Sequence, residues 1–268
     1  MSGFAADWLT LREPYDARAR NVAVRNAVAA AFADLQSISI VDLACGTGST
    51  LRALADHLPA RQNWKLVDND LGLLSRAADA SHARAKVTTA AVDLARDLEA
   101  ALDGAVDLVT TSALLDLVSD EWLERLAVEL ASRKLPFYAA LSYDGRITFE
   151  PADPFDAAII AAVNDHQRSD KGFGPALGPE AASQALMRLQ SVGYAVVHGA
   201  ADWIFEPRDR EIQFSVLESW ASAVRELGRL PLAEITAWLT RRRKLVADGR
   251  STIQVGHVDI FADPIGLR

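Results

Sequence analysis

The sequence has almost no cysteine, no basic leader and no long apolar run. Its single cysteine, Cys45, excludes an intrachain disulfide framework and any metal cluster built from cysteines alone, and suits a reducing cytoplasm. The start, MSGFAADWLTLREPYD, lacks a basic stretch followed by an apolar core, so we expect no signal peptide. The longest clearly apolar stretch, Ala157–Val163, is far too short to span a bilayer. These absences predict a cytoplasmic protein.

Positive charge and metal-ligand spacing are also lacking. The 28 lysines and arginines are outnumbered by 36 aspartates and glutamates, which gives a net charge of −8. An acidic balance argues against broad binding to nucleic acid or to an anionic membrane, because phosphates attract basic surfaces. The run Arg241–Lys244 ends an expected helix, where cations interact favourably with the helix dipole, so it predicts no nucleic-acid patch. No metal site is expected, because no ligand spacing relates Cys45 to His57, His82, His198 and His257.

Short apolar strands alternate with amphipathic helices through the first half of the chain of 268 residues. This alternation predicts βαβ units and therefore a parallel sheet with helices on both faces. The expected strands are Ile38–Leu43, Trp64–Val67, Val87–Val92, Val106–Thr111 and Phe137–Tyr143. The expected helices are Ala17–Leu35, Ser49–His57, Leu71–Ala80, Ala95–Leu102 and Asp120–Ser132.

The alternation stops after Tyr143. The segment Asp144–Pro179 is rich in Gly, Pro and Asp and shows no clear structure, so it is either functional or loosely ordered. A helix, Glu180–Val192, and a strand, Tyr194–Phe205, follow. About 45 residues, with two further expected helices (Arg210–Leu227 and Leu232–Val246), separate this strand from the last one, Thr252–Phe261. No repeat or low-complexity linker divides the chain. We expect one domain, 1–268, with a helical cap (1–36), a lid-like insertion (144–179) and a helical insertion (207–250).

The stretch ISIVDLACGTGSTLRAL, Ile38–Leu54, places two glycines between an apolar strand and a helix. The dinucleotide-binding turn of dehydrogenases needs a third glycine, and Leu51 stands there instead. No G-K-[ST] follows, which excludes a Walker loop. What remains is the pattern D-L-A-C-G-T-G.

This pattern resembles the first motif of the class I S-adenosylmethionine-dependent methyltransferases. The resemblance implies a doubly wound, mostly parallel seven-stranded sheet and S-adenosylmethionine as cofactor. It implies that Asp42 helps to hold the cofactor's ammonium group, directly or through water. It also implies that the turn containing Ala44, Gly46 and Gly48 lies against the amino acid end and the ribose. Ala44 stands where the family often has glycine.

Three further motifs of the family follow in order, and the resemblance extends over roughly Ile38–Tyr143. Asp68, with the adjoining Asn69, ends the second strand, where the family has an acidic residue that binds both ribose hydroxyls. Asp93 and Leu94 follow the third strand, in the positions that read the adenine amine and ring. Ser112 begins the turn beneath the methyl group. Each aspartate taken alone would ordinarily be a helix cap or a solvated turn residue, and it is the four motifs together that favour cofactor binding.

The residues that would bind the molecule receiving the methyl group, the methyl acceptor, are less well defined by the sequence. In the N-terminal segment, Arg12 and Tyr15 are candidates to contact the cofactor's carboxylate, although Asp16 could simply cap a helix beginning there. Asp116 and His166 are the candidate catalytic groups. For Asp116 the alternative is a cap before the Asp120 helix, and for His166 a solvated loop. The candidate substrate contacts are Trp8, Tyr143, Asn164, Lys171, Phe173 and Trp203.

The sequence thus predicts a methyltransferase that acts on a small organic molecule by in-line transfer. The alternatives are a non-catalytic module that binds S-adenosylmethionine and, disfavoured by Leu51, a nicotinamide-dependent oxidoreductase. Trp220 and Trp238 in the helical insertion predict apolar faces that pack on the protein's own body or on a second subunit, as in a homodimer.

Overall fold

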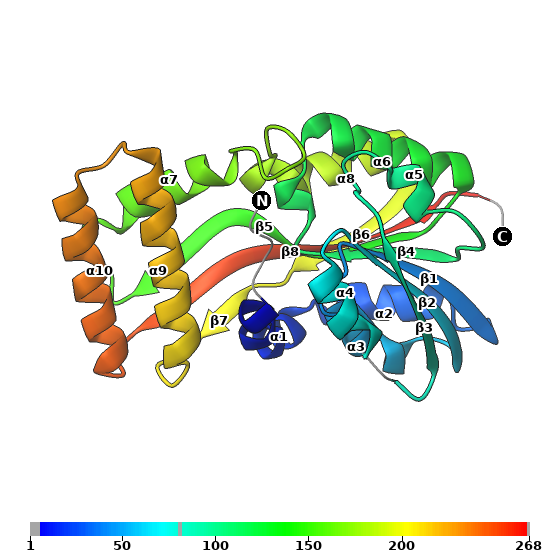
Figure 1. The fold of residues 1–268 in the computed structure, drawn as a ribbon, viewed down its shortest axis with the longest axis horizontal. Coiled ribbons are helices and arrows are strands. Elements are labelled where there is room, and N and C mark those ends of the chain that lie inside the picture. The colour runs from blue at the N-terminus through cyan, green and yellow to red at the C-terminus, as the bar shows by residue number, and fades with distance from the viewer. Residues whose placement is uncertain (1–5, 80–81, 267–268) are drawn as a thin grey trace.

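A single twisted sheet organises the chain, and Figure 1 shows it running through the whole length of the molecule. The computed structural model describes residues 6–79 and 82–266. The strand order is β3-β2-β1-β4-β5-β8-β6, and β7 pairs with β8 beside this path. The strands are β1 (Ser37–Leu43), β2 (Arg61–Asp68), β3 (Ala85–Ala91), β4 (Leu108–Ser112), β5 (Phe137–Glu150), β6 (Tyr194–Ala200), β7 (Trp203–Phe205) and β8 (Thr252–Pro264).

The last strand, β8, runs against the direction of the others. Strands β1 to β5 pair in parallel, whereas β8 pairs antiparallel with both β5 and β6. The other six strands of the path therefore point the same way. This confirms the predicted doubly wound, mostly parallel seven-stranded sheet, and the short β7 adds a further edge contact to β8.

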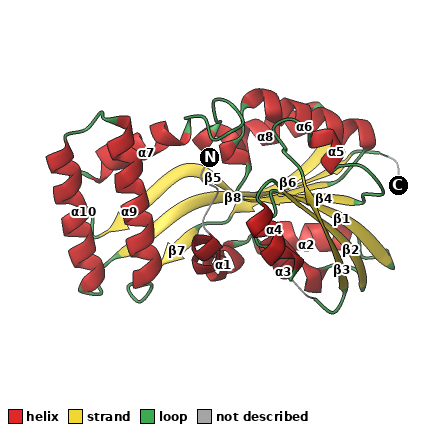
Figure 2. Ribbon diagram, viewed as in Figure 1, coloured by secondary structure: helices red, strands yellow, loops and turns green. Residues whose placement is uncertain are grey.

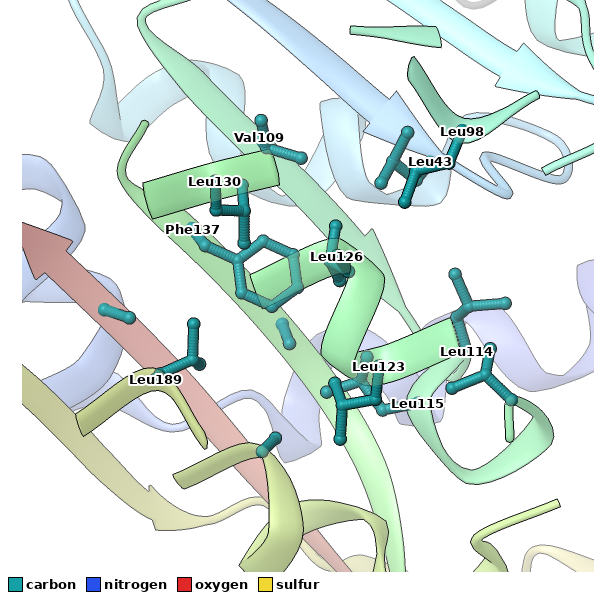
Figure 3. Packing of buried hydrophobic residues seen from close by; sticks show 14 of the residues in the cluster. Leu43, Leu98, Val109, Leu114, Leu115, Leu123, Leu126, Leu130, Phe137 and Leu189 are labelled. Atoms are coloured by element: carbon teal, nitrogen blue, oxygen red, sulfur yellow. The ribbon is translucent and has the colours of Figure 1, made fainter. Parts of the chain in front are cut away.

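Helices cover both faces of the sheet (Figure 2). On one face, side chains of α5, α6 and α8 pack on β1, β4 and β5, and Figure 3 shows Leu126, Leu130 and Phe137 at the centre of this core. On the other face, α2, α3 and α4 pack on the same strands. The α-helices are α1 (Ala6–Ala19), α2 (Val22–Ala31), α3 (Ser49–Leu54), α4 (Leu71–Ala78), α5 (Leu98–Ala101), α6 (Asp120–Arg133), α7 (Asp156–Gln167), α8 (Ala181–Ser191), α9 (Arg210–Leu227) and α10 (Leu232–Ala247). The 3₁₀ helices are η1 (Ala55–His57), η2 (Leu115–Leu117) and η3 (Gly178–Glu180).

A third core lies where β5 and β8 extend beyond the rest of the sheet. Helices α7, α9 and α10 close around these extensions, at the left of Figure 1. Trp238 is fully buried there, and both Trp238 and Trp220 contact the ring of Phe149 edge-on. Of the two interpretations of these tryptophans, packing on the protein's own body is therefore the one observed.

Three expected elements differ from the structure. The expected helix Ala17–Leu35 is two helices, α1 and α2, because Asn21 caps α2 by accepting the N–H of Val24. The segment expected to have no clear structure, Asp144–Pro179, contains the end of β5 and all of α7. The expected strand Tyr194–Phe205 is interrupted between β6 and β7. Ala80, the expected end of α4, and residues 1–5 of the expected cap lie outside the described residues.

The described residues contain neither a membrane-spanning helix nor a metal-binding group of side chains. None of the helices there is long and apolar enough to cross a membrane. Nor do histidine, cysteine and carboxylate side chains within 6–79 and 82–266 gather in a group able to hold a metal ion.

Candidate active site

A cavity of about 700 Å³ opens at the carboxyl ends of β1, β2 and β4, where open α/β sheets bind their ligands. Its wall includes nine of the residues singled out in the sequence, namely Arg12, Ala44, Gly46, Asp68, Asn69, Leu94, Ser112, Lys171 and Phe173. The sequence motifs therefore meet at one cavity, although they follow different strands.

The glycine turn forms the floor of the cavity. Ala44 and Gly46 both have positive φ, at 51° and 54°, and Gly48 caps α3 with a φ of 82°. The turn folds tightly because the N–H of Gly48 donates to the carbonyl of Cys45 at 2.8 Å. A Cβ on Gly46 would come within 3.2 Å of Leu9 Cδ1 from α1. The bare backbone of Gly46 is therefore what leaves room between the turn and α1.

Two carboxylates follow β1 and β2 at different depths. Asp68 lines the cavity; its Oδ2 accepts the N–H of Gly46 at 2.9 Å, and its Oδ1 accepts the N–H of Asp70 at 3.0 Å. Asp42 is fully buried behind the turn and lies outside the cavity wall. Its Oδ1 accepts a hydrogen bond from Thr110, and Oδ2 has no partner among the described residues. Burial raises the pKa of Asp42 to about 7.

The ends of β3 and β4 supply an apolar wall. Val92 and Leu94 line the cavity, whereas Asp93 between them turns away and accepts the N–H of Ala95. Ser112 lines the cavity after β4 and accepts a hydrogen bond from the buried Arg20 at 3.4 Å. Two side chains on one face of the following turn, Leu114 and Leu117, complete this wall.

Asp116 lies beside this wall but does not line it. Ser119, not Asp116, caps α6 by accepting the N–H of Trp122, so the capping alternative for Asp116 is wrong. The carboxyl is buried, its Oδ1 has no partner in the described part of the chain, and burial raises its pKa to about 6. The charges of Arg12 and Lys171, both in the cavity wall, oppose this increase in the pKa of Asp116.

Helix α1 covers the cavity with one face and contacts β7 with another. Leu9, Arg12 and Asp16 line the cavity. Asp16 lies inside α1, so it is not the helix cap that the sequence suggested; it accepts hydrogen bonds from Arg12 at 2.8 Å and Trp203 at 2.9 Å. No pattern in the sequence indicated this role. The pair fixes the Arg12 guanidinium at the cavity wall.

The remaining aromatic candidates pack around β7 instead of lining the cavity. Trp8 contacts Trp203 edge-on, with ring centroids 6.4 Å apart. Tyr15 contacts Phe205 in the same way and donates a hydrogen bond to Asp209 at 3.1 Å. These contacts hold α1 against the strand.

The loop after α7 closes the far end of the cavity with Lys171 and Phe173. The ring of Phe173 contacts Trp122 edge-on at 5.4 Å. His166 does not line the cavity; its Nδ1 lies 3.3 Å from Nζ of Lys171. Tyr143 and Asn164 also lie outside the wall, where the Tyr143 hydroxyl donates to Asn164 Oδ1 at 2.6 Å.

The residues present fit a cofactor with a vicinal diol and a cationic centre. Asp68 keeps one lone pair on each oxygen for hydroxyl groups, since each already accepts one backbone N–H. Asn69 and the apolar side chains of Leu71 and Leu94 surround the space next to it. The fold, with β8 inserted antiparallel between β5 and β6, is that of the class I S-adenosylmethionine-dependent methyltransferases.

The family comparison agrees with this class. Residues 40–134 match the model of a family described as "Methyltransferase domain". The chain therefore contains a methyltransferase domain over residues 40–134, and the fully buried Leu51 packs in the core where a dehydrogenase turn has glycine. Among curated proteins, none is significantly similar to the chain in sequence.

Solved structures share the fold at low sequence identity. A candidate type II methyltransferase from Anaeromyxobacter dehalogenans is 17% identical, with a TM-score of 0.52 and with 93% of this chain and 98% of that one covered. A cyclopropane-fatty-acyl-phospholipid synthase-like protein from Lactobacillus casei is 15% identical, with a TM-score of 0.50 and the same two coverages of 93% and 98%. At such identities the likeness shows the fold alone.

Proposed function

We propose that the protein transfers the methyl group of S-adenosylmethionine to a small organic molecule. The observation that carries this proposal is the cavity that runs from the glycine turn to Lys171 and Phe173. Its volume of about 700 Å³ lies within the range of small-ligand sites, ~300–1,000 Å³. Such a space accommodates a cofactor and a small acceptor, but not a folded macromolecule.

In this proposal the cofactor lies over Gly46, with its ribose on Asp68 and its adenine against Leu94. Arg12 offers its guanidinium to the carboxylate of the amino acid end. The acceptor lies between Leu114, Leu117 and Phe173, three apolar side chains that hold an apolar body and exclude water. The net charge of −8 supports a small-molecule acceptor over nucleic acid.

The proposal extends to organisation and surroundings. We propose that residues 1–268 act as one domain in the cytoplasm, with 144–179 as the lid over the acceptor and 207–250 as an insertion that supports it. The side chains of Lys171 and Phe173 support the lid assignment, because both reach the cavity from that segment. A homodimer through the insertion stays a prediction from the sequence, to be tested by analytical ultracentrifugation.

The test uses S-adenosylmethionine labelled with tritium in its methyl group. The protein is incubated with the metabolite fraction of a cell extract and, separately, with the macromolecular fraction. Label in small molecules supports the proposal, and label confined to protein or RNA contradicts it. Calorimetry in parallel shows whether S-adenosylmethionine binds. Binding without transfer to either fraction would favour the non-catalytic alternative.

A further inference from the structure

Three polar side chains form a chain from the helical insertion to the cavity. Glu226 lies in the last turn of α9, His166 in the last turn of α7 and Lys171 in the loop that follows α7. Oε2 of Glu226 lies 3.1 Å from Nε2 of His166, and Nδ1 of His166 lies 3.3 Å from Nζ of Lys171. Only Lys171, the last of the three, lines the cavity. The chain therefore ends in an amine at the acceptor end of the site.

The contacts determine which atoms donate. A carboxylate only accepts, so the N–H of the neutral imidazole lies on Nε2, facing Glu226. Nδ1 then carries the lone pair and accepts an N–H from Lys171. A second N–H of Lys171 is donated to Oγ of Ser169 at 2.9 Å. Two of the three free positions around Nζ are thus occupied, and the third is left for the cavity.

The third position acts differently in the two protonation states. In the neutral amine it holds the lone pair, and in the ammonium ion it holds a further N–H. Partial burial lowers the pKa of Lys171, while the charges of Glu226 on α9 and Asp116 on η2 oppose this effect. A sulfonium bound nearby would lower the pKa of Lys171 further, because two cations in one enclosed space repel. The net effect of these surroundings is to lower the pKa of Lys171 from its ordinary value, which makes the free amine more accessible.

We propose that Lys171 accepts the proton of the methyl acceptor and that His166 and Glu226 are positioning residues for it. This inference rests on the proposed function and names its substrate class. The acceptor has an apolar body and an O–H or N–H group that must lose its proton. A permanently anionic or already nucleophilic acceptor would need no such group.

The proton and electron balance is complete without a further reactant. S-adenosylmethionine supplies an electrophilic methyl group, and the electrons of its S–C bond remain on sulfur. The acceptor's O–H or N–H bond breaks, its proton goes to Nζ of neutral Lys171, and the electron pair forms the new bond to carbon. The positive charge lost at sulfur reappears on the lysine.

The experiment measures the titration of Lys171 directly, in the intact protein saturated with S-adenosylhomocysteine. The sequence has five lysines, so trace acetylation with acetic anhydride over a pH series is readily assigned by mass spectrometry. Lys244, whose side chain is 76% exposed, is the internal reference. We expect the midpoint for Lys171 to lie below that for Lys244. Equal midpoints, or a higher one for Lys171, would overturn the proposal.

Variants test the positioning residues. Glu226→Gln removes a charge that favours the ammonium form, so the midpoint of Lys171 should fall further. Glu218→Gln, on the same helix but paired with Arg243, is the matched control and should leave the midpoint unchanged. If Glu226 has only a structural role, the midpoint of Lys171 should be the same in Glu226→Gln and in Glu218→Gln. Circular dichroism verifies that each variant is folded.

The second measurement is the rate of methyl transfer to an acceptor identified in the tritium assay. Lys171→Met should abolish the acidic limb of the pH profile of kcat and slow transfer at least tenfold, with unchanged affinity for S-adenosylhomocysteine. His166→Ala should lower turnover, also without loss of cofactor affinity. If the cofactor fails to bind to the parent protein, the proposed function itself fails. If it binds and transfers but Lys171 titrates with Lys244, only the present inference fails.

Discussion

The backbone N–H of Gly46 donates a hydrogen bond to Oδ2 of Asp68, with the two atoms 2.9 Å apart. This bond joins the turn after β1 to the end of β2, so two neighbouring strands share one carboxylate. The other oxygen accepts the N–H of Asp70, which caps α4. The carboxylate is thereby held in one orientation before any ligand arrives, and pre-organisation of this kind lowers the entropic cost of binding.

Replacing Asp68 with alanine should weaken the binding of S-adenosylmethionine by about 2–3 kcal/mol, because the proposed cofactor position gives this cavity-lining carboxylate two charge-assisted hydrogen bonds to the ribose. Titration calorimetry measures the change. Asp34→Ala, at an exposed position after α2, removes the same charge away from the cavity and should leave affinity unchanged. Parent-like affinity in Asp68→Ala would remove this residue from the cofactor site.

Gly46→Ala should reduce both stability and cofactor affinity. The positive φ of 54° costs an L-residue roughly 1–2 kcal/mol, and the added Cβ would lie 3.2 Å from Leu9 Cδ1. Gly104→Ala is the control, since its φ is 101° but no atom lies within 4 Å of the added Cβ. It should lower stability without affecting the cofactor. Equal losses of affinity in both variants would contradict this account of the turn.

Asp42 should make the protein less stable as the pH rises. Its pKa is about 7 in the folded protein against an ordinary 3.8, so between these values the folded state binds more protons than the unfolded chain. The free energy of unfolding therefore falls over that interval and levels off above it. Asparagine does not titrate, so Asp42→Asn does not lose this part of its free energy of unfolding as the pH rises. The free energy of unfolding of the variant minus that of the parent should therefore increase with pH, by up to ~4 kcal/mol. Urea unfolding across the interval measures this, and a constant difference would refute it.

The neighbouring arginines of α10 should respond very differently to replacement by methionine. Arg242 is fully buried, forms two contacts with Asp156 and donates to the carbonyl of Pro151 at 2.7 Å. Arg242→Met leaves a buried carboxylate without its cation and should cost about 3–5 kcal/mol. Arg243→Met breaks an exposed pair with Glu218 and should cost less than ~1 kcal/mol. Thermal unfolding distinguishes the two, and similar losses would show that burial does not decide the effect.

The sequence by itself determined the parallel part of the sheet and the part of the cavity wall that follows its strands. The spacing of apolar runs predicted β1 to β5, because strands buried on both faces need continuous apolar stretches. Gly46, Asp68 and Leu94 were predictable for a second reason. Each lies directly after a strand, and the carboxyl ends of parallel strands meet at one edge of a sheet.

Helix α7 and the break between α1 and α2 were not predicted, in each case for a local reason. Helix α7 has apolar residues on several sides, so its sequence shows no helical period of apolar positions. Its last turn is polar, like the loop that follows, so composition did not mark where the helix ends. The break between α1 and α2 depends on one capping side chain, Asn21, whose contact with Val24 is not visible in a helical apolar pattern.

Only the tertiary structure decided which side chains of the N-terminal helix line the cavity. Trp8, Tyr15 and Trp203 looked like pocket walls in the sequence, but α1 turns them toward β7 and presents Leu9, Arg12 and Asp16 instead. The contact of His166 with Glu226 joins residues 60 positions apart. Such a pair follows no local period, because it depends on how α7 and α9 dock around the extended ends of β5 and β8. Local spacing determines which strand a residue ends, whereas the docking of helices determines what its side chain touches.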